Sequence, residues 1–165
     1  MIKLGYIGNH AADTLPVRIG WAATRAVQTG KFKRVTHTES VLSGTNYKRC
    51  TIASSSARDK GVRIKENITL TKGHWIALEV PGFNADRSRS WFVLYLGCAY
   101  DWVGAIATKL PFLRPISRRF TWFFCNEACL AAFIHRADSY TPSESFDLLV
   151  SRFGAVDVTD EFFKD

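Results

Sequence analysis

Cys125 lies in the segment FFCNEACLAAF, residues 123–133, between an aromatic pair and an alanine-rich run that favours a helix. A thiol at the amino end of a helix meets unpaired backbone N–H groups and the positive end of the helix dipole, which favour the thiolate. Such a position can lower the pKa of a thiol from about 8.5 to roughly 3.5–7.5, and the same N–H groups can stabilise an oxyanion. This position predicts a nucleophile, and a small core residue is the alternative.

Cys129 follows one helical turn later on the same face and is expected to fill the core. The spacing CNEAC differs from the CxxC of thiol oxidoreductases, so we do not expect a redox pair with Cys125. No second pair of Cys or His at ligand spacing completes a zinc site in the sequence. The sequence therefore predicts no metal and no organic cofactor.

A nucleophilic cysteine needs a base, usually a histidine, which folding brings near it. His135 follows Cys125 by ten residues on the same expected helix, about 15 Å along its axis, and cannot reach it. His10 is expected in a loop, and His74 precedes an expected strand. The remaining histidine, His37, differs from these because of its neighbours in the sequence.

His37 lies within VTHTESVL, residues 35–42, whose alternating β-branched residues predict a strand. Glu39 follows two residues later and projects from the same face of that strand. A carboxylate beside an imidazole can fix its tautomer and stabilise the imidazolium, which is the third role in a catalytic triad. We therefore predict His37 as the base and Glu39 as its partner. A polar pair on the solvent face of the sheet is the alternative.

The elements that must position these residues follow in an α+β order. An apolar segment over 2–8 predicts a first strand, and 15–29 predicts a helix with Pro16 in its first turn and Gly30 at its exit. Short connections then separate four predicted strands, which suits antiparallel pairing in one curled sheet or small barrel. These strands are expected over 35–42, 47–54, 61–65 and 74–81.

Helices are predicted in the second half of the chain. Asn84 or Asp86 can cap a helix that ends near Gly97, and a further helix is expected to begin within 100–107. Two more are expected, over 126–136 and after the TPSE capping box at 141–144.

Composition narrows the class of protein. The 165 residues contain no apolar run of about 18 that could cross a bilayer, and no linker or repeat, so we expect a single domain over 1–165. The first residues lack the pattern of a secretory signal, which predicts cytoplasmic synthesis and free thiols. The net charge of +7 favours encounter with polyanions, but the basic residues are scattered, and we expect no specific nucleic-acid binding.

Four motifs, in this order, resemble the circularly permuted papain-like amidases, relatives of the NlpC-type cell-wall endopeptidases of bacteria and phages. They are THTES at 36–40, SARDKGVRIK at 56–65, YDWVGAI at 100–106 and FFCNEACLAAF at 123–133. The resemblance covers about residues 35 to 135. It implies a papain-like α+β fold, permuted so that the histidine strand precedes the nucleophile helix.

The resemblance also implies roles for individual residues. The family's histidine motif, approximately S-H-V-E, resembles T-H-T-E and implies that His37 is the base. Its nucleophile motif, approximately F-C-S-E, resembles F-C-N-E and implies that Cys125 is the nucleophile, with Asn126 in place of serine as cap and hydrogen-bond donor. Tyr100 and Asp101 match a Y-D-x-x-G segment that packs beside the nucleophile, with the tyrosine hydroxyl near the oxyanion. Residues at the entry of a helix are the alternative for both.

In relatives the third member of the triad is a polar residue on the strand after the histidine. The corresponding segment, RCTIASSS, offers Thr51 or Ser54. Glu39 is kept as the prediction because its spacing from His37 puts both side chains on one face.

The activity that the resemblance implies is hydrolysis of an amide or isopeptide bond by a cysteine nucleophile, without a cofactor. Peptidoglycan peptides are the expected class of substrate. A lipid-directed thioesterase or acyltransferase is the nearest enzymatic alternative. A non-catalytic binding or virion-associated protein of the same fold is the alternative from another class, and a phage protein would act in a particle or after lysis.

Overall fold

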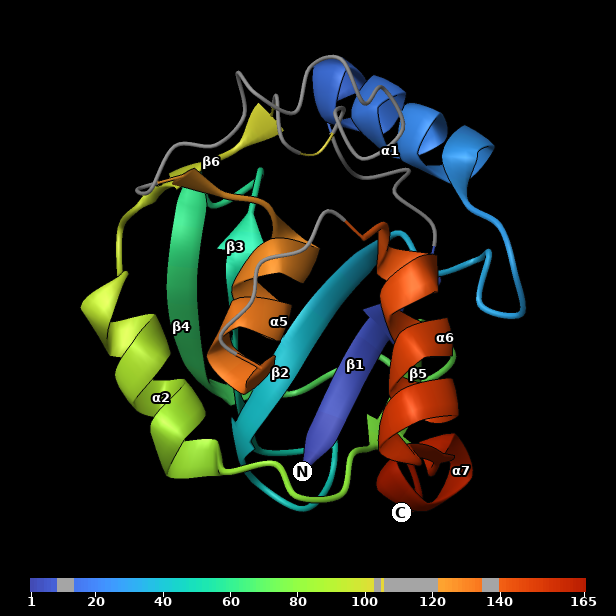
Figure 1. Ribbon diagram of the computed structural model, residues 1–165, viewed down its shortest axis with the longest axis vertical. Helices are drawn as coiled ribbons and strands as arrows, with labels where there is room; N and C mark the ends of the chain where they lie inside the picture. The colour runs from blue at the N-terminus through green and yellow to red at the C-terminus, as the bar shows by residue number, and fades with distance from the viewer. Residues whose placement is uncertain (9–13, 103–104, 106–121, 135–139) are drawn as a thin grey trace.

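A curled sheet forms the centre of the protein. The computed structural model describes residues 1–8, 14–102, 105, 122–134 and 140–165 (Figure 1). Its strands are β1 (Ile2–Tyr6), β2 (His37–Ser43), β3 (Cys50–Ser56), β4 (Gly61–Ile68), β5 (Trp75–Glu79), β6 (Ala99–Tyr100), β7 (Trp122–Phe123) and β8 (Val156–Asp157). They form one eight-stranded sheet in the order β7-β6-β4-β3-β2-β1-β5-β8, antiparallel except for β6–β7. The predicted α+β class is confirmed, and β2, β3 and β4 pair antiparallel in chain order as predicted. The fourth predicted strand, β5, joins the same sheet but pairs with β1 rather than with β4.

Helices cover both faces of the sheet. The described helices are α1 (Leu15–Val27), α2 (Ala85–Leu94), α5 (Cys125–Ile134), α6 (Pro142–Phe153) and α7 (Thr159–Phe162). Figure 1 shows α5 lying across β2 and β3, with α2 on one side of it and α6 on the other. The start of α5 therefore lies against the central strands rather than at the rim of the molecule.

Alternation along β2 buries apolar residues on both faces of the sheet. Leu42 packs with Phe92 of α2 and Ala128 of α5. Val41, the preceding residue, belongs to a different cluster that includes Phe162 of α7. Because helices α2 and α5 cover one face and α7 covers part of the other, polar residues on this strand are buried as well.

Local capping signals fix where the helices begin. The Thr141 side chain accepts from the backbone N–H of Glu144, whose carboxylate accepts from the N–H of Thr141 at 2.8 Å, so the predicted capping box is present. Asn84, rather than Asp86, caps α2 by accepting from the N–H of Arg87 at 2.9 Å. The positions of α2 and α6 thus follow from their first turns.

Two predicted helix boundaries need correction. The prediction of 15–29 is two residues too long at its end, because Gln28 is extended and its side chain accepts from the N–H of Ser143. The alternative for Tyr100 and Asp101, at a helix entry, is wrong for Tyr100, which ends β6. It is right for Asp101, which precedes helical Trp102 and whose carbonyl oxygen accepts from the N–H of Ala105 at 3.1 Å. The rest of that segment, like His10 and His135, lies outside the described residues.

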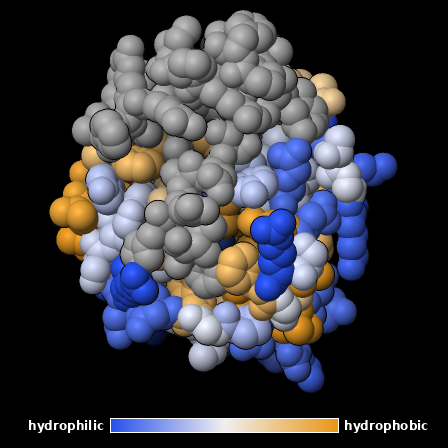
Figure 2. Space-filling view, viewed as in Figure 1, coloured by the Kyte–Doolittle hydropathy of each residue, from blue (hydrophilic) through white to orange (hydrophobic). Residues whose placement is uncertain are grey.

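The surface is mainly hydrophilic over the visible described face, with apolar side chains gathered at the edge where α2 ends (Figure 2). The exposed apolar residues there are Val93, Leu94 and Leu96. Of the helices described, none is long and apolar enough to cross a membrane.

Candidate active site

The predicted base and nucleophile lie at the same end of the central sheet. His37 is the first residue of β2 and Cys125 is the first residue of α5. Figure 1 shows both elements beginning at the upper end of the sheet, beneath α1. His37 is 7% exposed and Cys125 is 3% exposed, so both side chains are buried.

The electrostatics of the pair favour a thiolate beside an imidazolium. Burial alone raises the pKa of a thiol and lowers that of an imidazole. The attraction between the two charged forms outweighs burial, so the pKa of Cys125 is lowered and that of His37 is raised to about 10. A backbone hydrogen bond from Thr38 also lowers the pKa of Cys125.

Glu39 is the residue that holds the other side of the imidazole. Its Oε1 lies 2.8 Å from Nε2 of His37, and its side chain is buried. Burial raises the pKa of this carboxyl, but Arg63 and His37 together hold it well below its usual range. Nδ1 of His37 is buried and makes no hydrogen bond with the described residues. This is the ring nitrogen left to exchange a proton with the thiol.

The other residues considered for the third position are engaged elsewhere. Ser54 donates its hydroxyl hydrogen to the carbonyl oxygen of Thr38 at 2.6 Å. Thr51 pairs with Ser43, at the opposite end of β2 from His37. Of the three candidates, the prediction from strand spacing selects the one that contacts the imidazole.

Tyr100 and Asp101 lie beside the strand that leads into the nucleophile. Tyr100 pairs with Phe123, and the N–H of Asp101 donates to the Phe123 carbonyl oxygen at 3.2 Å. The pKa of Tyr100 is raised, first by burial and then by the charges of Cys125 and Asp101. The tyrosine hydroxyl is therefore close enough to the sulfur to interact with its charge. Its role at an oxyanion stays a prediction.

Asn126 makes a contact that fixes the start of α5. Its Nδ2 donates to the carbonyl oxygen of Tyr140 at 2.8 Å, and the side chain is buried. This bond ties the first turn of α5 to the residue that precedes the capping box of α6. The contact fits a supporting role, and no described contact bears on an oxyanion role.

Cys129 differs from Cys125 although both belong to α5. It is fully buried, and its thiol lies 3.6 Å from the carbonyl oxygen of Thr38 and 3.8 Å from that of Ala53. It fills the core between the helix and the sheet, as predicted. All four cysteines are free, and the described residues contain no group of three His, Cys, Asp or Glu side chains that could hold a metal ion.

Sequence reasoning missed three residues around the pair. Arg63 on β4 donates to both carboxylate oxygens of Glu39, with Nη1 2.8 Å from Oε2. The ring of Trp21 on α1 meets that of His37 edge-on at 5.8 Å. Lys3 on β1 is buried and donates to the hydroxyl of Ser40 at 2.9 Å. Only Arg63 had a usable signal, because it lies in a motif of the resemblance and on a predicted strand.

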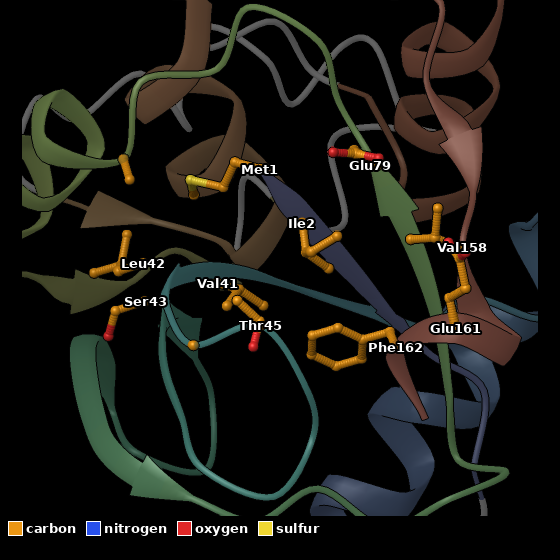
Figure 3. Close-up of a pocket in the computed structure, with 12 residues that line it drawn as sticks. Met1, Ile2, Val41, Leu42, Ser43, Thr45, Glu79, Val158, Glu161 and Phe162 are labelled. Atoms are coloured by element: carbon orange, nitrogen blue, oxygen red, sulfur yellow. The ribbon is translucent and has the colours of Figure 1, made fainter. Parts of the chain in front are cut away.

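One pocket among the described residues lies away from this cluster. It has a volume of about 430 Å³ and is lined in part by the end of β2, as Figure 3 shows. His37 and Ser43, at the two ends of β2, are six residues apart, which corresponds to roughly 20 Å along an extended strand. The pocket and the cysteine–histidine pair are therefore separate features.

No family model, no curated protein and no solved structure matches this chain.

Proposed function

We propose that this protein is a papain-like cysteine hydrolase that cleaves an amide or isopeptide bond. The single observation that carries the proposal is the buried pair of Cys125 and His37, with Glu39 2.8 Å from the far side of the imidazole. A structural cysteine needs neither an imidazole nor a carboxylate behind it. A nucleophile needs both.

The reaction begins from the thiolate–imidazolium pair, in which the proton of the Cys125 thiol has already passed to His37. The thiolate attacks the carbonyl carbon of the substrate, and the C=O electrons move onto oxygen to give a tetrahedral oxyanion. Backbone N–H groups in the first turn of α5 and the hydroxyl of Tyr100 are the proposed donors to this oxygen. His37 then gives its proton to the leaving nitrogen as the C–N bond breaks, which leaves a thioester on Cys125.

Water completes the cycle. His37, neutral after the first half of the reaction, takes a proton from water, whose oxygen attacks the thioester carbon. The C–S bond breaks, the carboxylic acid product leaves, and the thiolate–imidazolium pair forms again. Glu39 stays ionised throughout and stabilises the imidazolium each time it forms.

The burial of the pair sets a condition on access. A thiol that is 3% exposed reacts with a substrate only when the chain covering it moves. Trp21 packs on the imidazole, so α1 forms part of that cover. The net charge of +7 suits an acidic polymer as substrate, and peptidoglycan peptides belong to that class.

A panel of peptidoglycan fragments, isopeptides and acyl thioesters tests the proposal. Wild type is expected to hydrolyse an amide or isopeptide, and Cys125→Ala is expected to lose about 10⁴-fold or more of that activity. Cys129→Ala is the matched control, because it removes a thiol one turn away and is expected to keep turnover.

The panel also separates the alternatives. Hydrolysis of acyl thioesters alone would favour the lipid-directed enzyme. A wild type without turnover, whose four thiols react equally slowly with iodoacetamide near pH 6, would favour the binding protein. Amide hydrolysis that persists in Cys125→Ala would remove the mechanism.

A further inference from the structure

A chain of charged side chains extends beyond the cysteine–histidine pair. Arg63 donates to both oxygens of Glu39, and its Nε donates to Oδ2 of Asp59 at 2.8 Å. The ammonium of Lys65 donates to the other oxygen of Asp59, Oδ1, also at 2.8 Å. The charges therefore alternate in sign from Cys125 to Lys65, and the proposed reaction uses only the inner part of this array.

The strand geometry explains how these residues meet. Arg63 and Lys65 are two residues apart on β4 and project from the same face. Asp59 lies in the turn that joins β3 to β4, within reach of both. Arg63 pairs with Ser54 on β3, the strand between β4 and β2, so its long side chain reaches across one strand to Glu39.

We propose that Arg63, held in place by Asp59, is a positioning residue that keeps the Glu39 carboxylate charged and aimed at Nε2 of His37. The proposal rests on the proposed function, since it assigns a task to residues behind the same nucleophile. It also gives a role to the motif SARDKGVRIK, which the reaction itself does not use.

The identity of the residue supports this role. A guanidinium offers a planar pair of N–H groups to a carboxylate, while its Nε–H remains free for a second partner. Arg63 uses all three nitrogens in this way, two on Glu39 and one on Asp59. A lysine keeps the charge but cannot fix the plane of the carboxylate.

Stability alone is a poor explanation for the array. The Arg63 side chain is 13% exposed and that of Glu39 is 3% exposed, and burying such a pair costs desolvation that its attraction often fails to exceed. The exposed pair Arg89–Glu66, at 3.8 Å, carries no such cost. A cation placed on the far side of Glu39 has a specific consequence for His37, which a measurement can detect.

The consequence appears at acid pH. Without Arg63, burial raises the pKa of the Glu39 carboxyl, so the carboxylate is lost at a higher pH and the imidazolium loses its anionic partner. The Cys125 thiolate is then present over a narrower range of pH. We expect the acid limb of Cys125 alkylation to move to higher pH by at least about one pH unit, which is roughly a tenfold slower reaction below the midpoint.

The test is the pH dependence of iodoacetamide alkylation of Cys125, followed by mass spectrometry of its peptide. Arg63→Gln is expected to show the full upward shift of the midpoint, and Arg63→Lys and Asp59→Asn smaller shifts in the same direction. Arg89→Gln, which removes an arginine from an exposed ion pair, is the matched control and is expected to keep the wild-type midpoint. The midpoint is compared rather than the absolute rate, because opening of the cover scales every rate.

Three results would overturn the role of Arg63. The first is a folded Arg63→Gln, with wild-type near-ultraviolet circular dichroism, that keeps the wild-type midpoint. The second, if Arg63→Gln does not fold, is a folded Asp59→Asn with an unshifted midpoint. The third is an Arg89→Gln that shifts equally. Alkylation needs no substrate, so failure of the substrate panel with a shifted midpoint would count against the hydrolase alone.

Discussion

The two ends of β2 differ in almost every property that draws attention to a site. At the start of the strand, His37 and Glu39 are buried among paired charges and lie beside a cysteine. At its end, Leu42 and Ser43 border an open hollow of about 430 Å³ that also has the exposed carboxylates Glu79 and Glu161 on its rim. The lining of the hollow contains no cysteine or histidine, whereas the buried cluster contains both.

The described pocket and the buried charges therefore lie at different ends of β2. Burying charge is unfavourable unless each charge finds a partner. A buried array of alternating charges therefore indicates a functional role. A hollow at the end of a sheet does not by itself indicate a function, because loops commonly leave gaps between them. Chemistry is therefore the better guide, and each prediction below tests that choice.

The largest expected effect is that of His37→Ala on the thiol at the buried end. Without the imidazole, burial dominates and raises the pKa of Cys125, so the thiolate nearly disappears at neutral pH. Alkylation of Cys125 by iodoacetamide at pH 6 is expected to fall by about 100-fold or more. His74→Ala is the matched control. An equal loss of alkylation rate in both variants would show that His37 has no special effect on the Cys125 thiol.

The pH dependence of wild-type turnover also tests the pairing of His37 with Cys125. The pKa of His37 is raised to about 10, so the imidazolium is present below that pH and is lost as the pH rises through it. The pKa of Cys125 is lowered, so the thiolate is present above the lowered value and is lost as the pH falls through it. Turnover that needs both forms is expected to follow a bell with its alkaline limb near pH 10. An alkaline limb near 6.5, the ordinary pKa of histidine, would contradict the pairing.

A smaller effect is expected from Tyr100→Phe. Loss of one donor to an oxyanion costs about 100-fold in kcat with little change in KM, because the interaction forms only in the transition state. Tyr95→Phe is the matched control, since it also removes a tyrosine hydroxyl and its ring packs on the rings of Trp91 and Phe123. Steady-state kinetics on the best substrate of the panel measures both. A change confined to KM would show that Tyr100 binds substrate rather than the oxyanion.

The smallest effect is expected at the open end of β2. Glu161→Gln and Glu79→Gln remove the two carboxylates at the hollow and are expected to leave kcat/KM within about twofold, since exposed charges at this separation are screened by salt. A loss of more than tenfold in kcat/KM in either variant, with normal folding, would show that the hollow takes part in the reaction. The open end of β2 would then belong to the active site.

Much of the fold follows from local patterns. The Thr141 capping box and the existence of the four strands β2 to β5 were predictable because their signals are contained within a few residues. The two-residue strands β6, β7 and β8 were not, because each forms only against a partner distant in sequence, as Val156 does against Glu79. Tyr100 joined a strand for the same reason.

In the site, too, contacts within one strand were predictable and contacts between distant elements were not. Two residues on one strand share a face whatever surrounds them, which is why the contact between His37 and Glu39 could be predicted. Arg63 comes from two strands away and Trp21 from a separate helix, so their contacts depend on sheet order and helix placement. The meeting of His37 with Cys125 was expected from the chemistry of the pair, and spacing alone did not require it.

Gly61 joins the strand that carries Arg63 to the strand that carries Tyr100, and this limits which amino acids its codon can encode. It pairs with Ala99 on β6, and a Cβ at this position would lie 2.0 Å from the carbonyl oxygen of Cys98. Any side chain would push β6 outward, together with Tyr100 and the strand before Cys125. Every single-nucleotide replacement of a glycine codon by that of another amino acid adds at least this carbon. Purifying selection for activity should therefore act as strongly on codon 61 as on the codons of the reacting groups.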